Sequence, residues 1–227
     1  NYSIDLRWTS DNDLGRTRGF NWVTGIYRFV REVDLERDYT WFEVPYVSKF
    51  DVSRSALYGQ GTFSLSDRFS FSTGLRLEGH DSKFIDSFDV RFSPQDSLLG
   101  GKAVLEMLAS ENSRFHASIS KGYKSGGFNT SGSLDEPLRL FEPEILWNIE
   151  LGWIVEFEKS DASLRALLFK MDRSDVQIST SIVRVREDGS SEFVEFTGNA
   201  AEGVNQGLEL EYAQRVNDLS LIHISEP

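Results

Sequence analysis

Apolar and polar side chains alternate along most of this chain, and this two-residue period constrains its fold more than any other feature. In residues 69–78, phenylalanine, threonine and leucine fall on one face of an extended strand, whereas serine, glycine, arginine and glutamate fall on the other. Residues 115–120 and 147–153 repeat the pattern. Such alternation predicts strands with one apolar face. No stretch of comparable length has a helical period, so we predict an all-β protein.

The connections between these strands are the second constraint, because short and long ones alternate in strict order. Short turns are expected at residues 66–67, 110–112 and 158–161, and long polar segments at 34–51, 81–98, 122–143 and 175–203. Outer-membrane barrels segregate their connections in this way, with short turns on the periplasmic side and long loops outside. Soluble sandwiches have no reason to do so. We therefore predict an antiparallel transmembrane β-barrel.

Nine long strands follow from this pattern. They are expected at residues 2–9, 20–33, 53–65, 68–80, 100–109, 114–121, 144–157, 162–175 and 203–214. A small additional hairpin is expected in the last long segment, where two alternating runs flank Asp188 and Gly189. An Asp-Gly pair between alternating runs is a strong signal for a tight turn.

The composition agrees with a barrel and excludes several other classes. Aromatic residues make up 13% of the chain and hydrophobic residues only 39%, which suits an apolar surface band rather than a closed core. No apolar run approaches the roughly 20 residues of a membrane-spanning helix. The net charge of −12 argues against nucleic acid, whose phosphates would be repelled. The absence of cysteine excludes a disulfide framework and cysteine-based metal sites.

The last nine residues require a separate interpretation. They spell Leu-Ser-Leu-Ile-His-Ile-Ser-Glu-Pro, the in-frame translation of CTGTCTCTTATACACATCTCCGAGCCC, a transposase end used in sequencing libraries. We therefore expect a partial barrel domain over residues 1–218 and a non-native tail over residues 219–227, which is left out of fold reasoning. Since residue 1 enters a strand pattern directly, we also expect the chain to begin within a longer protein.

One polar, glycine-containing segment stands out after the strand expected at residues 114–121. It comprises Gly122, Tyr123, Lys124, Ser125, Gly126, Gly127, Phe128 and Asn129. This segment resembles one near the extracellular rim of TonB-dependent receptors. Other stretches resemble motifs of that family in the family's own order: WVTGIY at 22–27, ALYGQ at 56–60, LSDR at 65–68, TGLR at 73–76, FEPE at 141–144, NIELG at 148–152, NAAEG at 199–203 and GLELE at 207–211.

The resemblance implies a plugged 22-stranded barrel in the bacterial outer membrane. Such a receptor imports an iron chelate (a ferric siderophore) or another scarce nutrient, with energy supplied through TonB. The implied partners are outer-membrane lipid, the small-molecule ligand and the TonB complex, the last through an N-terminal region missing here. This chain has neither a plug nor a TonB box. We therefore expect about nine of the 22 strands, forming an open curved sheet that cannot transport alone.

Candidate ligand contacts are expected in the long external loops, because aromatic rings can stack on a flat chelate and arginine can pair with an anionic one. These candidates are Trp41, Phe42, Tyr46, Arg139 and Phe141. An equally good interpretation places the aromatic residues in the membrane-interface girdle. For the segment 122–129, a structural role at the barrel mouth is favoured over direct ligand contact.

No catalytic, cofactor or metal site is predicted. The glycines and Lys124 do not form a phosphate loop, since no helical pattern follows Asn129. Glutamates on strand faces are ordinary in a water-filled lumen and do not indicate a carboxylate pair. His116 falls on a polar strand face, where hydrogen bonding is expected rather than metal binding. Also, Gly126 and Gly127 are expected to permit positive φ where the chain leaves the barrel wall.

Three alternatives remain open at this point. A passive porin-like barrel would share the membrane location but lack a plug. An outer-membrane or soluble β-rich hydrolase would need a polar triad or carboxylate pair on adjacent strands. A soluble binding sandwich would need the apolar faces of successive strands to meet in one core.

Overall fold

The structure is a computed structural model that describes residues 1–10, 19–40, 43–131, 134–217 and 220–226. Almost all of the described chain is β-strand. The long strands are β1 (Tyr2–Thr9), β2 (Phe20–Arg37), β3 (Tyr46–Ser64), β4 (Phe69–Asp86), β6 (Gln95–Ser110), β7 (Ser113–Lys124), β10 (Glu144–Phe157), β11 (Ala162–Val185), β12 (Ser191–Asn217) and β13 (Ser220–Glu226). Shorter elements are β5 (Arg91–Phe92), β8 (Gly127–Phe128), β9 (Leu140–Phe141) and the 3₁₀ turns η1 (Glu136–Leu138) and η2 (Glu158–Ser160).

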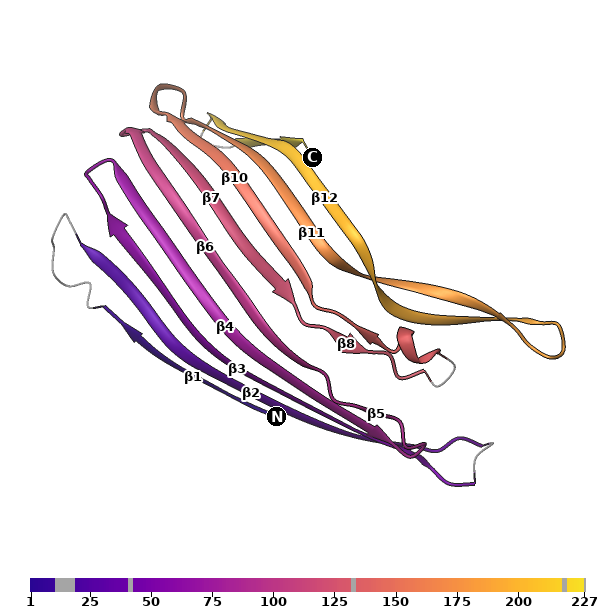
Figure 1. Ribbon diagram of the computed structural model, residues 1–227. Coiled ribbons are helices and arrows are strands. Elements are labelled where there is room, and N and C mark those ends of the chain that lie inside the picture. The colour runs from indigo at the N-terminus through magenta and orange to yellow at the C-terminus, as the bar shows by residue number, and fades with distance from the viewer. Residues whose placement is uncertain (11–18, 41–42, 132–133, 218–219, 227) are drawn as a thin grey trace.

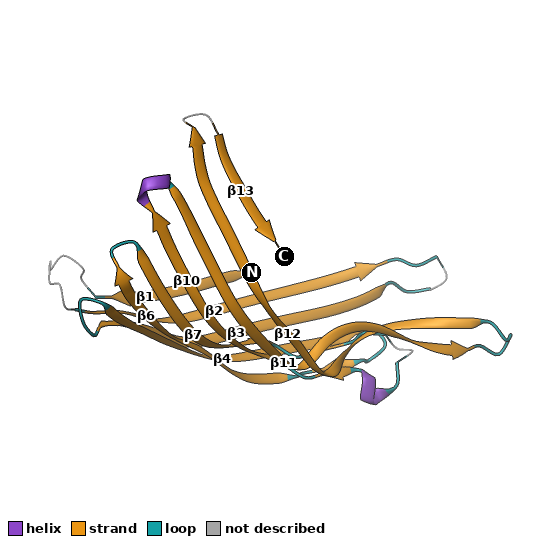
Figure 2. Ribbon diagram, turned by 90° about the horizontal axis from the view of Figure 1, so that it is seen from above, coloured by secondary structure: helices purple, strands orange, loops and turns teal. Residues whose placement is uncertain are grey.

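The long strands form one antiparallel sheet in the order β1-β2-β3-β4-β6-β7-β10-β11-β12-β13, with β5 paired to β4. The sheet is curved and open, and β1 and β13 are its two edges (Figures 1 and 2). Sequential neighbours therefore pair throughout, as in an up-and-down barrel. The prediction of an all-β, open, antiparallel barrel sheet is confirmed.

The short and the long connections lie at opposite ends of the sheet, as predicted. The turns between β3 and β4, β6 and β7, and β10 and β11 are short and gather at one end (Figure 1). The connections between β2 and β3, β7 and β10, and β11 and β12 gather at the opposite end, where β11 and β12 extend farthest. We call these the short-turn end and the long-connection end.

The outer face of the sheet carries a continuous band of exposed apolar side chains. Register places Leu6, Ile26, Leu57, Leu77 and Leu99 in one row across five neighbouring strands. Leu105, Ala117, Leu151, Leu168 and Leu208 form a second row across the next strands. The leucines and the isoleucine of these rows are all exposed. Such a band is what a membrane-spanning barrel presents to lipid.

Aromatic side chains line this band at the short-turn end. The rings of Phe20 and Phe63 stack with centroids 4.4 Å apart, and those of Phe115 and Trp153 stack at 5.8 Å. Aromatic residues favour the water–lipid boundary because they combine an apolar ring with tolerance of a polar neighbourhood. These pairs mark the lower edge of the membrane-spanning part. Among the described residues, no helix is long and apolar enough to cross a membrane.

The inner face is concave and largely polar. Side chains on this face reach across intervening strands: Tyr123 Oη on β7 donates to Glu78 on β4 at 3.2 Å, with β6 between them. Tyr58 Oη on β3 donates to Asp5 on β1 at 2.7 Å. The apolar faces of successive strands do not meet in a common core, so the soluble-sandwich alternative is wrong for the described residues.

The strands are longer than predicted, and most of the difference lies at the long-connection end. Residues 34–37, 46–51, 81–86 and 95–98 belong to paired strands rather than loops. The expected small hairpin is the continuation of β11 and β12, with its tip at Gly189, whose φ is +81°. Outside the membrane both faces of a strand are wet, so ladder hydrogen bonds persist without the side-chain alternation used to predict strands.

Candidate functional site

The segment 122–129 folds back onto the inner face of the sheet instead of projecting outward. It leaves the wall at the end of β7 and forms β8, which pairs with β9 in a separate two-stranded sheet. The ring of Phe128 then packs among three rings of the wall, at centroid distances of 5.6 Å from Phe50, 5.4 Å from Phe84 and 5.1 Å from Phe92. This aromatic cluster anchors the segment to β3, β4 and β5.

Hydrogen bonds to strands on either side of the same segment also hold it in place. The backbone N–H of Gly126 donates to Asp96 Oδ2 on β6 at 3.0 Å. The side-chain amide of Gln177 on β11 donates to the carbonyl of Ser125 at 2.8 Å. Asn129 pairs with the backbone of Thr197 on β12. The segment therefore bridges β6 to the β11–β12 hairpin and forms a shelf at the mouth of the curved sheet.

Gly126 and Gly127 of this shelf lie where there is no room for a larger side chain. A Cβ at Gly126 would lie 2.6 Å from the carbonyl oxygen of Phe141, and one at Gly127 would lie 2.6 Å from the Phe141 ring. Neither residue has a positive φ; among the described glycines only Gly189 does. The prediction that they permit positive φ is wrong, because close approach to β9 explains them instead.

A cavity of about 670 Å³ lies between this shelf and the wall. Its lining comes from the inner faces of β2, β3 and β4 and from the shelf itself. The lining residues are Phe29, Arg31, Val33, Leu35, Ser48, Phe50, Val52, Arg54, His80, Ser82, Phe84, Ser125, Gly126, Gly127, Phe128, Thr130 and Phe141. Its size is within the range of small-molecule sites.

His80 is buried at the wall of this cavity, with 6% of its surface exposed. Its Nδ1 accepts a hydrogen bond of 3.0 Å from Arg54 Nε. His80 lies closer to the long-connection end than Leu77 does. The adjacent residues Gly79 and Asp81 face outward, and neither belongs to the apolar band. Burial and the positive charge of Arg54 lower the pKa of His80 below its usual value, although Asp96, Glu78 and Asp81 act in the opposite direction. The ring is therefore held neutral.

Glu144 fixes the start of β10 beside the shelf. Its carboxylate accepts from Arg173 Nε at 2.7 Å and from the backbone N–H of Gln177 at 2.9 Å. Burial opposes its ionisation, but these two partners together lower the pKa of the carboxyl. Glu144 lies closer to the long-connection end than Trp147. On the outer face, the Lys121 ammonium lies over the Trp147 ring, 5.8 Å from its centroid. Trp147 marks the upper edge of the membrane-spanning part there.

The predicted ligand contacts are dispersed in the structure. Trp41 and Phe42 lie outside the described residues. Tyr46 donates to Asp86 at 3.3 Å and its ring packs near Phe88, away from the cavity. Arg139 Nε donates to the carbonyl of Leu134 at 3.0 Å. Of the three candidates within the described residues, Phe141 alone lines the cavity.

The remaining members of the 122–129 segment are also placed. Gly122 and Lys124 end β7, and Lys124 is exposed. Tyr123 is half-buried and bonded to Glu78. The residues that sequence reasoning missed are the inward-facing Phe29, Arg31 and Arg54. The two-residue spacing of Phe29 and Arg31 in the sequence indicates that they share one face of β2. The sequence does not show which part of the wall lies under the shelf.

A second group of polar side chains lines the inner face nearer the short-turn end. His116, Glu150, Arg165, Glu209 and Glu211 border a cavity of about 650 Å³. The His116 ring covers Gly152, where a Cβ would be 1.9 Å from its Cε1. Among the described residues, no group of three or more histidine, aspartate or glutamate side chains is arranged to hold a metal ion.

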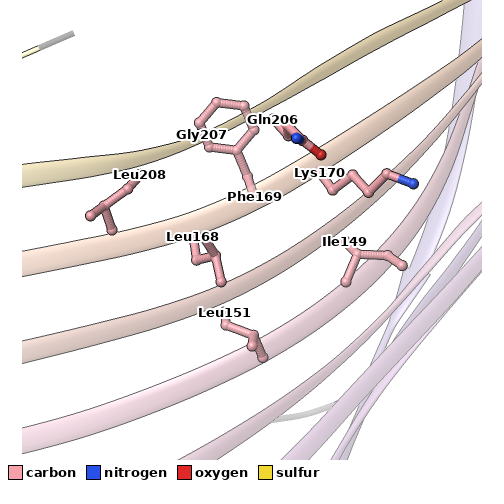
Figure 3. A pocket seen from close by; sticks show the side chains of 8 residues that line it. All are labelled: Ile149, Leu151, Leu168, Phe169, Lys170, Gln206, Gly207 and Leu208. Carbon is pink, nitrogen blue, oxygen red and sulfur yellow. The ribbon is translucent and has the colours of Figure 1, made fainter.

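The outer face has a shallow groove of about 480 Å³ across β10, β11 and β12 (Figure 3). Leu151, Leu168 and Leu208 lie in one row, and Ile149 and Lys170 lie in the next (Figure 3). Because Leu151, Leu168 and Leu208 belong to the apolar band, this part of the groove suits the acyl chains of lipid.

The family model described as "TonB dependent receptor-like, beta-barrel" matches residues 1–224. The chain belongs to this family. Pesticin receptors of Yersinia pestis and Yersinia enterocolitica are each 25% identical to it over 225 residues, covering 92% of this chain and 32% of the relative. The chain thus spans about a third of the length of these relatives.

Solved TonB-dependent receptors share the fold. The ferric yersiniabactin uptake receptor FyuA of Yersinia pestis superposes with a TM-score of 0.70 and 23% identity, over 95% of this chain and 32% of that chain. The siderophore receptor PiuA of Acinetobacter baumannii superposes with a TM-score of 0.67 and 13% identity, over 99% and 38%. TonB-dependent receptors are transporters rather than enzymes, so the prediction that this chain is no enzyme is confirmed by its family.

Proposed function

We propose that this chain is part of the wall of an outer-membrane receptor of a Gram-negative bacterium that actively imports an iron chelate or another scarce nutrient. The observation that carries the proposal is the shelf formed by residues 122–129. Phe128 and Asp96 fix it to the inner face, so it narrows the mouth of the barrel at the long-connection end. Such a narrowing can select and retain a small solute entering from outside.

In this proposal the apolar band contacts outer-membrane lipid and the inner face lines the path of the solute. Energy would reach the receptor through the TonB complex, which would bind an N-terminal region beyond this chain. No chemistry is performed on the ligand, and no cofactor or nucleic acid takes part. The ferric siderophore is the favoured ligand class because relatives such as the ferric yersiniabactin uptake receptor carry that function in their names.

The test uses the complete receptor gene in a Gram-negative host that lacks its own high-affinity iron receptors. We expect growth on iron-limited medium with at least one siderophore, and expect that growth to disappear when TonB is deleted. The porin-like alternative predicts solute entry that does not depend on TonB. Failure of every siderophore tested, together with TonB-independent leakage of small solutes, would refute the proposal.

A second candidate function is docking of a protein toxin. The β11–β12 hairpin projects beyond the other strands (Figure 1) and carries exposed apolar side chains, with Val185 76% and Phe193 69% exposed. Relatives are named pesticin receptors, and one structural neighbour was solved with pyocin S2. Toxin killing that requires the hairpin tip but not the shelf would support this function; killing unaffected by removal of the tip would exclude the hairpin as its site.

We also propose that residues 1–218 are a partial receptor barrel domain and that residues 219–227 are a sequencing-adapter translation. Within the sheet, the backbone of this stretch pairs as β13 with the free edge of β12. An unpaired edge accepts almost any extended segment, so this pairing is compatible with either origin. Sequencing the source DNA past codon 218 decides the question: a native receptor sequence should replace the adapter.

A further inference from the structure

A row of three charged or titratable side chains crosses the inner face and ends at the shelf. Arg54 on β3, His80 on β4 and Asp96 on β6 are register partners on neighbouring strands. Arg54 Nε donates to His80 Nδ1 at 3.0 Å, and Asp96 Oδ2 accepts from the backbone N–H of Gly126 at 3.0 Å. The imidazole therefore lies between a cation and the carboxylate that holds the shelf.

The hydrogen bond to Asp96 ties the middle of the shelf to β6. Tyr123 bonds to β4 at the root of the shelf, and the side chain of Asn129 joins its far end to β12. The ring of Phe128 packs against β3, β4 and β5 without a directional bond. Without Asp96 the shelf would keep its root and its far end, but it would lose the hydrogen bond that holds its middle against β6.

Other charges around His80 leave Asp96 as the carboxylate best placed to pair with it. The charged groups that face or adjoin His80 from the elements packed against it are Arg31, Arg54, Glu78, Asp81 and Asp96. Glu78 is already engaged by Arg76, whose Nε donates to it at 2.9 Å. Asp81 follows His80 on the same strand and faces the opposite side of the sheet. The shelf residues that line the cavity have no titratable side chain.

Protonation of His80 would change its contacts with both neighbours. A neutral imidazole can accept a hydrogen bond, but the imidazolium carries a hydrogen on both ring nitrogens and accepts none. The bond from Arg54 would be lost and two cations would adjoin, so the imidazolium would favour Asp96 as its partner. Because a charged donor binds a carboxylate more strongly than a neutral one does, Asp96 would shift away from the N–H of Gly126.

We propose that this row is a pH-operated latch: neutral His80 leaves Asp96 on Gly126, whereas protonated His80 draws Asp96 away and releases the middle of the shelf. Burial and the charge of Arg54 lower the pKa of His80, so the latch is closed at neutral pH and opens below about pH 6.5, the usual histidine value. By linkage, the closed shelf resists protonation as much as protonation loosens the shelf. The latch sets the width of the mouth whichever solute the receptor imports.

Hydrogen–deuterium exchange of the complete receptor in detergent tests the latch. Exchange of residues 126–129 is read at pH 7.5 and 5.5 and corrected for the intrinsic effect of pH. We expect about tenfold faster corrected exchange at pH 5.5, because loss of one charge-assisted hydrogen bond shifts a local opening equilibrium by roughly that factor. His80→Gln cannot take up the proton and should remove the difference. His116→Gln is the matched control, since His116 borders the other inner cavity, and it should leave the difference intact.

Two further variants separate the latch from a general loosening in acid. Asp96→Asn weakens the acceptor of the Gly126 N–H and should give fast exchange at both pH values. Arg54→Gln removes a positive charge beside His80, so the pH midpoint of the change should rise, which loss of packing alone would not cause. Equal corrected exchange of the native shelf at both pH values, or an acid response that persists in His80→Gln, overturns the proposal. An Arg54→Gln midpoint at or below the native one does the same.

Discussion

The side chain of Asn129 pairs with the backbone of Thr197 as a further strand residue would. Its amide donates to the Thr197 carbonyl at 2.8 Å, and its carbonyl accepts from the Thr197 N–H at 2.9 Å. These bonds join the last residue of the shelf to the β11–β12 hairpin, 68 positions along the chain. The shelf and the hairpin are therefore mechanically connected at the mouth of the sheet.

Asn129→Ala should loosen both elements together. The substitution leaves the half-buried backbone groups of Thr197 without this partner, at a local cost of about 1–3 kcal/mol. We expect faster hydrogen exchange in residues 191–200, with exchange in the membrane-spanning strands unchanged. Asn205→Ala, an exposed position on the same strand, is the control. Unchanged exchange around Thr197 in the Asn129 variant would show that the pairing contributes nothing to local stability.

Gly152→Ala should destabilise the inner face through His116. The added methyl group would lie 1.9 Å from Cε1 of the His116 ring, and overpacking of this kind costs about 1–3 kcal/mol. Urea unfolding of the complete receptor in detergent micelles measures the loss. Gly79→Ala is the control, because no atom lies within 4 Å of a Cβ there. Adding His116→Ala should restore stability; a double variant as weak as Gly152→Ala alone would contradict the predicted contact.

Leu168 and Leu167 are adjacent but face opposite sides of β11. Leu168 lies in the apolar band with 54% of its surface exposed, whereas Leu167 lines the inner cavity near Glu150 and Glu209. Leu168→Arg should reduce the free energy of unfolding in a bilayer by about 2–4 kcal/mol, because a charge enters lipid. Leu167→Arg makes the same change on the wet face and should cost far less. Equal effects would mean that the outer face is not in lipid.

The stability of the long-connection end should fall in mild acid. His80 has a lowered pKa in the folded state, owing first to burial and then to Arg54. Below about pH 6.5, the usual histidine value, the unfolded chain takes up a proton that the folded chain resists, so stability falls as pH drops toward the folded pKa. Urea midpoints between pH 7.5 and 5.0 test this. His80→Asn should flatten the profile over that range, and an unchanged slope would assign it to other groups.

The sequence was sufficient for the parts of the fold that depend on local pattern. Alternation placed Leu77 and Leu151 on an apolar outer face, and Asp188 with Gly189 located the hairpin tip. The short turns expected at residues 66–67, 110–112 and 158–161 each join two strands that pair in the sheet. None of these features needs knowledge of contacts between segments distant in the chain, since period and turn chemistry set them.

The candidate site was less predictable because it depends on register and curvature. Phe128 meets Phe50 only because the sheet is concave and the segment after β7 folds inward. Arg31 and Arg54 share a cavity because of the β2–β3 pairing. Motif recognition identified the shelf, but it assigned the role of Gly126 to backbone conformation when the cause is contact with Phe141. Such contacts between distant segments are not encoded in any local pattern.

The most direct test of the account is cysteine labelling of the complete receptor in intact cells, using a membrane-impermeant maleimide. This chain has no cysteine of its own, so Val185→Cys near the hairpin tip and Lys159→Cys in the short η2 turn are each compared with the complete receptor without the substitution, whose labelling is subtracted. A receptor wall in the outer membrane predicts labelling of Val185→Cys in intact cells and of Lys159→Cys only after the outer membrane is opened. Equal labelling of both positions, or the reverse order, would contradict it.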